Sequence, residues 1–597
     1  MTCRPEARTV LRTIGGGLGA ILLLLAACSE PLPEAAPIER AQQALAAQDG
    51  LGAEIILREM LAGGTPEMEI AAYLGEAELQ QGQIAEARRW LESSSFTPAT
   101  AGRGFHMLGR ARMREGNLPE AGMAFDRALE FIPESPDLWV DIGRLRYLGG
   151  EHRQAVDASI RAAELGPQNV AALQFRAQLV RDAAGPEAAL PWYEAALESN
   201  RDNLALMGDY AATLGELGQL KDMLVVVRRM IELDEENSQA FYLQAVLAAR
   251  GGRFDLARNL LDRSGSLQRE TPAAMLLSGI IDLETGNHAS ASQMFDRLER
   301  MQPDNARIRL LAARSLALGG KHRELVHRFE DRAGQPGAPP YLTTLVGRSY
   351  EVLGERAKAA LYLDLAARST ATGLRPLPSA TSLDVALARG PKTGPDAAAL
   401  VRALLGAGQP AAAIDNAEAF LRLAPGSGDA AALAGDAYIF AGQGRKAAEY
   451  YANAAEIRQF WPLARRMVAA ELAAGRRQSA LTLLEYQLAK NSANTEAAVM
   501  LARAELQSGN AAKAGLLLDL AIANGAARDP QVWMLRAETA LALDDAETAR
   551  EAAIRAYSLQ RMNPEATGLL ARILTQTGGS DAQAQALAHK AARLQRR

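Results

Sequence analysis

One spacing constrains this 597-residue sequence more than any other feature: small residues recur at intervals of 34. In the block that starts at Pro136, glycine occupies repeat positions 8 and 15 and alanine occupies position 20. The register holds through ten consecutive blocks and resumes for five more after a break, with one-residue slips at two joins. The blocks start at Glu34, Met68, Gly102, Pro136, Val170, Leu204, Ser238, Pro272, Ala306, Pro340, Gly394, Gly428, Trp461, Thr495 and Pro530. Such a period excludes a string of independent globular domains and indicates stacked modules.

The residues that recur point to pairs of helices. Position 20 is alanine in thirteen of the fifteen blocks, and position 15 is glycine in twelve. Alanine favours helix, and two helices with two turns fill about 34 residues. A glycine just past the first helix suits the left-handed residue that ends many helices. Large residues at position 24 are expected to fill the space between successive pairs, for example Phe125, Tyr193, Phe295 and Tyr451.

These columns resemble the tetratricopeptide repeat (TPR), whose consensus has small residues at positions 8, 20 and 27, a large apolar residue at 24 and often proline at 32. Proline occupies position 32 at Pro133, Pro167, Pro303 and Pro425. The resemblance covers nearly all of the chain after its leader. It implies an all-α solenoid: a right-handed superhelix of antiparallel helix pairs, about 15 repeats plus a capping helix, with the first helix of each pair on the concave side.

The repeat register divides the chain into segments. Residues 34–373 are expected to form an N-terminal array of ten repeats, and residues 394–563 a C-terminal array of five. The prolines and glycines of residues 374–393 predict a loop that is either a hinge or a passive bulge, with a short helix near 382–387. Residues 564–597 are expected to form a partial repeat that grades into a capping helix.

Residues 1–27 are expected to be a targeting leader. Three arginines precede an apolar run over 14–27 that is too short to span a bilayer. The run ends in Leu25-Ala26-Ala27-Cys28, which resembles the signal of bacterial lipoproteins. The resemblance implies cleavage before Cys28, lipidation of that cysteine and a tether over 28–33, whereas the alternative is an ordinary secretory signal or a short anchor. Because serine follows the cysteine, the resemblance places the chain on the periplasmic face of the outer membrane.

The sequence offers little for catalysis. The two cysteines are Cys28 and one in the leader, so we expect no disulfide, thiol nucleophile or cysteine-bound metal. The six histidines form no HExxH pair, and no phosphate-binding GxxxxGK[ST] or nucleophile-bearing GxSxG is present. We therefore expect no enzyme, no metal and no cofactor. A net charge of −5 gives no overall electrostatic case for nucleic acid.

Arginine is frequent at position 9, which the resemblance places on the concave side. Of 65 basic residues 57 are arginine, and seven of them occupy this position: Arg110, Arg144, Arg314, Arg348, Arg402 and Arg503, with Arg572 in the partial repeat. One interpretation is a broken ladder of guanidinium groups that binds an acidic peptide or an anionic polymer. The other is a solvated face on which each arginine pairs with acidic neighbours.

Between the arginines the same face turns apolar. The residues concerned are Tyr242, Val246, Leu276, Ile280, Leu283 and Leu310. An apolar patch of this size predicts a site for a partner helix or an extended peptide. The alternative is an interior that closes on itself.

Together these features predict a non-enzymatic protein–protein interaction scaffold, held to the membrane by its lipid. Such chains resemble the scaffold lipoproteins of envelope assembly, which serve exopolysaccharide export, pilus assembly and outer-membrane protein insertion. Length and repeat number resemble the exopolysaccharide-export group most. The expected partners are other envelope proteins, and the alternative is direct binding of an anionic polysaccharide by the arginine ladder.

Overall fold

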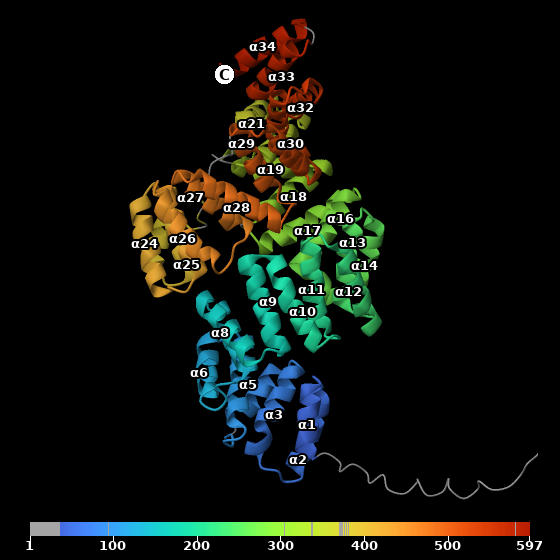
Figure 1. The fold of residues 1–597 in the computed structure, drawn as a ribbon, viewed down its shortest axis with the longest axis vertical. Helices are drawn as coiled ribbons and strands as arrows, with labels where there is room; N and C mark the ends of the chain where they lie inside the picture. The colour runs from blue at the N-terminus through green and yellow to red at the C-terminus, as the bar shows by residue number, and fades with distance from the viewer. Residues whose placement is uncertain are drawn as a thin grey trace, which may run out of the picture. The chain divides into compact units, whose positions relative to one another are not determined.

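The computed structural model describes residues 36–596 except 94, 304, 336–337, 369–373, 375, 378, 380 and 579–580. The predicted leader, Cys28 and the tether lie outside the described residues. Within them, 34 α-helices and one short 3-10 helix form and no strand occurs, which confirms the all-α solenoid (Figure 1). None of the described helices combines the length and apolar character needed to cross a membrane.

The chain divides into two compact units, residues 1–133 and 134–597. The predicted division at 374–393 lies inside the second unit, and the ten-plus-five organisation of the repeats stays a prediction. The first unit contains three helix pairs: α1 (Pro37–Ala46), α2 (Gly50–Ala62), α3 (Glu67–Gln80), α4 (Ile84–Ser93), α5 (Ala101–Arg114) and α6 (Leu118–Leu129).

The second unit begins with the longer series of pairs. These helices are α7 (Pro136–Leu148), α8 (His152–Leu165), α9 (Val170–Ala184), α10 (Pro186–Ser199), α11 (Leu204–Glu216), α12 (Leu220–Leu233), α13 (Ser238–Arg250), α14 (Phe254–Arg263), α15 (Gly265–Arg269), α16 (Pro272–Glu284), α17 (His288–Met301), α18 (Ala306–Leu318), α19 (His322–Gly334), α20 (Pro340–Val352) and α21 (Arg356–Arg368). The five-residue α15 follows a shortened second helix and has no counterpart in the repeat pattern.

The remaining helices of the second unit begin with α22, the short helix expected near 382–387, which packs against α23. They are α22 (Leu383–Arg389), α23 (Gly394–Gly406), α24 (Pro410–Leu423), α25 (Gly428–Phe440), α26 (Gly444–Ala455), α27 (Trp461–Ala473), α28 (Arg477–Lys490), α29 (Thr495–Gln507), α30 (Ala511–Ala523), the 3-10 helix η1 (Ala526–Arg528), α31 (Pro530–Ala542), α32 (Ala546–Leu559), α33 (Pro564–Gln576) and α34 (Asp581–Gln595).

Local chemistry sets where the first helix of each pair begins. In most repeats this helix starts at repeat position 1, as at Pro136 and Pro272. Proline suits the first position of a helix because its fixed φ is helical and its missing N–H has no helical partner there. Elsewhere an asparagine caps the start: the side chain of Asn203 accepts the N–H of Leu206 at 3.0 Å.

The turn between the two helices of a pair needs a left-handed residue at position 15. Glycine supplies it in most repeats, for example Gly116 with φ 78°. Three repeats lack a glycine at position 15. One has Ala184 there, and its glycine with positive φ follows one residue later, at Gly185. The other two carry Gln48 and Asp544. These are the two non-glycine residues with positive φ in the described part of the chain, at 60° and 58°. The register therefore imposes the left-handed turn even where the residue disfavours it.

The large residue at position 24 packs against the small residue at position 8 of its own pair. A Cβ atom on Gly109 would lie 2.3 Å from Cε1 of Phe125, and one on Gly279 would lie 2.6 Å from Cε1 of Phe295. The ring of Phe295 also contributes to a core that includes buried residues of the following repeats. The repeat pattern predicted that these rings lie between successive helix pairs. The structure shows that they also fill the space between the two helices of one pair.

We predict that Gly279→Ala destabilises the chain, because the new methyl group would overlap the ring of Phe295. Overpacking of a well-filled core costs about 1–3 kcal/mol. Gly568→Ala is the matched control, since its Cβ would meet only Cβ of Ala591, at 3.7 Å. Alanine is favoured over glycine inside a helix, so the control should keep or gain stability. Urea unfolding followed by circular dichroism measures both, and equal stability of the two variants would contradict the prediction.

Candidate functional site

Five side chains on the first helices of three consecutive repeats form a partly exposed apolar surface. We call them the apolar wall: Tyr242 and Val246 on α13, Leu276 and Ile280 on α16, and Leu310 on α18. All five are half-buried. Leu276, Ile280 and Leu310 pack against one common core cluster. These three are therefore anchored in the core, while part of their apolar area stays accessible to a partner.

Leu283 does not belong to the apolar wall. The sequence placed it on the concave side at position 12, but its side chain is only 5% exposed and belongs to the core cluster around Phe295. A residue at this depth packs between repeats and cannot contact a partner without unfolding.

Tyr242 brings the one hydroxyl group of the apolar wall. Burial raises the pKa of Tyr242. The phenol therefore stays protonated at neutral pH and can donate a hydrogen bond from a surface that is otherwise apolar.

The position-9 arginines are largely balanced by carboxylates. Arg144 lies 3.3 Å from Asp141. On the later helices, Arg314 lies 3.5 Å from Glu284. The shortest of the three contacts is the 2.5 Å pair of Arg348 with Glu351 on the same helix. These pairs agree with the solvated-face interpretation for the three arginines.

Two further position-9 arginines, Arg402 and Arg503, act on acids whose pKa is raised. Burial raises the pKa of Asp436, and the charges of Arg466 and Arg402 oppose that rise. Loss of hydration raises the pKa of the Asp529 carboxyl, and the charge of Arg503 opposes that rise. Two members remain. Arg110 lies in the first unit, where its Nη1 donates to Sδ of Met107 at 3.8 Å, and Arg572 lies 3.9 Å from Glu538.

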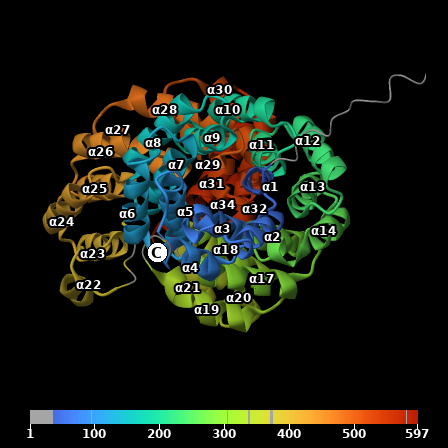
Figure 2. The same cartoon turned by 90° about the horizontal axis from the view of Figure 1, so that it is seen from below.

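Within the second unit, the turns that precede α25 and α27, in the later group of helices, contact α8 and α9 across a large sequence separation. Figures 1 and 2 both show α8 next to this later group of helices. We call these contacts the clasp. The N–H of Arg153 donates to the carbonyl of Gly426 at 3.1 Å, and the N–H of Gln459 donates to the carbonyl of Asp182 at 2.9 Å. An ion pair at 2.6 Å joins the guanidinium of Arg153 to Glu456.

A buried histidine lies in the clasp. The N–H of Gly428 donates to Nδ1 of His152 at 3.2 Å, so that nitrogen must be unprotonated. Burial lowers the pKa of His152, and the nearby charge of Arg458 lowers it further, while Asp429 opposes both. The ring of Tyr147 contacts the imidazole edge-on, with 5.1 Å between the ring centroids. Its hydroxyl donates to Asp182 at 2.9 Å.

Sequence reasoning missed the clasp altogether. His152 and Gly428 are 276 positions apart, and Arg153 and Glu456 are 303 apart. Repeat periodicity reports which residues contact the neighbouring repeat and carries no signal about distant ones. Among the described residues no cluster of histidine, cysteine, aspartate and glutamate could hold a metal ion.

Sequence models of the tetratricopeptide repeat match residues 106–170, 276–324 and 471–539. The chain therefore carries tetratricopeptide repeats, as the 34-residue columns predicted. No curated protein matches it.

Several solved structures are similar to parts of this chain. A tetratricopeptide repeat protein from Parabacteroides merdae is 19% identical, with a TM-score of 0.29 over 39% of this chain and 91% of that one. PilF from Pseudomonas aeruginosa is 16% identical, with a TM-score of 0.30 over 34% and 94%. The human IFIT1 dimer is 16% identical, with a TM-score of 0.34 over 64% and 90%. At these identities the likeness concerns the fold alone.

We predict that acidification loosens the clasp. Because the folded protein lowers the pKa of His152, the unfolded chain binds the proton more readily. The stability that neutral His152 contributes is therefore present above the ordinary histidine pKa of about 6.5 and decreases as the pH falls below it. The thermal midpoint should fall on acidification. The thermal midpoint of the His152→Asn variant should fall less than that of the unaltered protein, because the amide oxygen of asparagine can accept the Gly428 N–H at any pH. Equal falls in both proteins would argue against a role for this histidine.

Proposed function

We propose that this chain is a non-enzymatic scaffold that binds other proteins of the bacterial envelope. The observation that carries the proposal is the apolar wall, where side chains on α13, α16 and α18 are half-buried and half-accessible. Tetratricopeptide repeats are consistent with a protein–protein interaction role. The occupant that suits such a surface is a helix or an extended peptide that presents apolar anchors at helical or strand spacing.

The proposal includes attachment of the scaffold to the periplasmic face of the outer membrane through lipidated Cys28. Its support is the sequence Leu25-Ala26-Ala27-Cys28 after an apolar run. Several acyl chains give stable anchoring where a single chain binds only marginally. Support of an envelope machine such as exopolysaccharide export is the pathway that the resemblance favours, with pilus or outer-membrane protein assembly as the alternative.

Direct binding of an anionic polysaccharide is the weaker candidate. It requires a row of guanidinium groups free to pair with the polymer. Arg144, Arg314 and Arg348 instead pair with carboxylates of the chain itself. To bind, each anionic group of the polymer would have to displace a carboxylate of the chain from its arginine. The net gain in charge–charge energy would then be small.

The apolar wall can be tested by charge insertion in the full-length protein. We expect Tyr242→Asp and Ile280→Asp each to reduce the amount of co-purifying envelope protein at least about tenfold, because a desolvated carboxylate opposes apolar docking. Leu256→Asp is the control: Leu256 is 43% exposed but lies on α14, the second helix of its pair. Quantitative mass spectrometry reads the result. Unchanged partners in both wall variants, with the fold intact by circular dichroism, would refute the proposed site.

The anchoring is tested separately. Cys28→Ser removes the thiol that would carry the lipid, so the protein should move from the membrane fraction to the soluble periplasmic fraction. Fractionation followed by immunoblotting measures this, with radiolabelled palmitate incorporation as a second readout. Membrane association that survives the substitution would contradict lipidation at this cysteine.

A further inference from the structure

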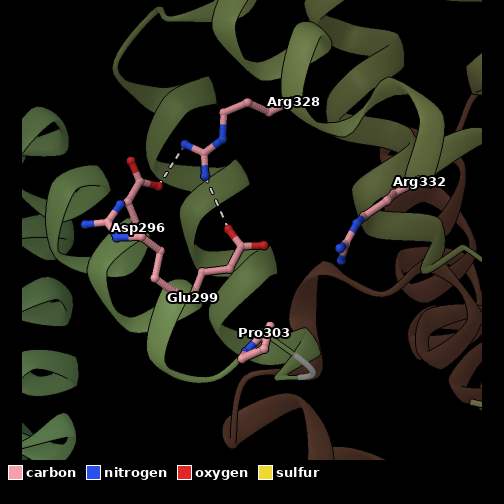
Figure 3. Close-up of a pocket in the computed structure, with 6 residues that line it drawn as sticks. Asp296, Glu299, Pro303, Arg328 and Arg332 are labelled. Atoms are coloured by element: carbon pink, nitrogen blue, oxygen red, sulfur yellow. Dashed lines mark hydrogen bonds and ion pairs between the residues drawn. The ribbon is translucent and has the colours of Figure 1, made fainter. Parts of the chain in front are cut away.

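The second helices of two consecutive repeats border a cavity that the proposed scaffold role does not use. It lies between α17 and α19 and has a volume of about 380 Å³. The apolar wall, by contrast, belongs to first helices. We call this cavity the arginine cavity. Its lining residues are Asp296, Glu299, Arg300, Pro303, Arg328 and Arg332, of which Figure 3 labels all but Arg300.

One side of the arginine cavity is a fixed network of ion pairs. Arg328 extends from α19 to α17, where it lies 2.7 Å from Asp296 and 3.2 Å from Glu299. Arg309 on α18 approaches the other oxygen of Glu299 at 3.3 Å. All four side chains are half-buried. Both acids of the lining are therefore already neutralised by arginines of the chain.

The other two arginines of the lining have no such partner. Arg300 and Arg332 are exposed, and neither forms an ion pair within the part of the chain that the structure describes. Figure 3 shows Arg332 extending from α19 toward the cavity. The lining as a whole carries three arginines and two acids, so its excess charge is positive and belongs to these two guanidinium groups.

We propose that the arginine cavity binds the carboxylate side chains of an acidic peptide segment. Guanidinium groups bind carboxylates through two parallel N–H···O bonds, which makes this the ligand chemistry of Arg300 and Arg332. The site is a second docking surface, and it does not depend on the apolar wall. A partner seated there would contact second helices while the first helices stay accessible.

One feature favours a peptide over a densely charged polyanion. The lining holds three arginines and two acids, so its net positive charge is small. A ligand with isolated carboxylates therefore suits it better than one with closely spaced charges.

The test measures binding of a fluorescent peptide of alternating glutamate and glycine to the purified full chain by anisotropy, with a glutamine–glycine peptide beside it. We expect the glutamate peptide to bind in a salt-sensitive manner. The double variant Arg300→Gln/Arg332→Gln should bind it at least about tenfold more weakly, since hydrogen bonds to charged groups are the stronger ones. Arg297→Gln is the matched control, because Arg297 is on the same helix and equally basic but pairs with Glu270.

Each other outcome overturns the proposal. No binding by the unaltered chain, or equal binding by the double variant, removes the site. An equal loss in Arg297→Gln shows that net charge alone binds the peptide. Displacement of the peptide by polyuronate or inorganic phosphate at matched anion concentration excludes the peptide assignment. Ile280→Asp should bind the peptide normally, so failure of the apolar wall and failure of the arginine cavity are distinguishable.

Discussion

The close approach of two helices within each repeat is the contact on which the rest of the structure depends. It exists because position 8 is small enough to receive the residue at position 24, as Gly435 receives the fully buried ring of Tyr451. A pair packed in this way still exposes an apolar face, which only the next pair can cover. Small residues are therefore required throughout, and large rings have few places. This explains why aromatic residues make up only 5% of the chain.

The sequence predicted those features that repeat with the period. The start of the first helix at Pro136 and Pro272 follows from proline chemistry and from the register. The left-handed turn follows from glycine, and the register still imposes it at Gln48 and Asp544. Local backbone preference and nearest-neighbour packing thus account for the fold.

The features that could not be predicted from the sequence depend on the surroundings of individual residues. Leu283 occupies a column expected on the surface, yet its own neighbours bury it. The clasp joins His152 to a backbone amide, a partner that has no side-chain signature. The arginine cavity depends on which guanidinium groups remain after others have paired, and composition cannot tell these apart. The fold could therefore be predicted from the periodicity of the sequence. The candidate sites could not, because they depend on which side chains form contacts in three dimensions.

Arginine serves three different purposes in the second unit. At position 9 it mostly neutralises nearby acids, and in the clasp it joins distant repeats. In the arginine cavity, Arg300 and Arg332 have no ion-pair partner among the described residues and remain free to bind an added carboxylate. A planar group with five donors can satisfy two acids at once, as Arg328 does with Asp296 and Glu299. Lysine can also contact two acids, as Lys513 does with Glu485 and Glu505, but it lacks the planar group that fixes the geometry of such pairs. The preference for arginine over lysine has a structural use here.

The clasp also changes how the second unit can fold. In an uninterrupted solenoid every contact is local, so any stretch of repeats can form or melt with reference only to its neighbours. A bond between residues 152 and 428 closes a loop of some 276 residues. Its entropic cost grows only with the logarithm of loop length, but the contact cannot form before both ends have acquired their structure. During synthesis from the N-terminus, the contact between His152 on α8 and Gly428 on α25 cannot form until α25 has been made. Closure is then a late event that ties the intervening helices into one cooperative block.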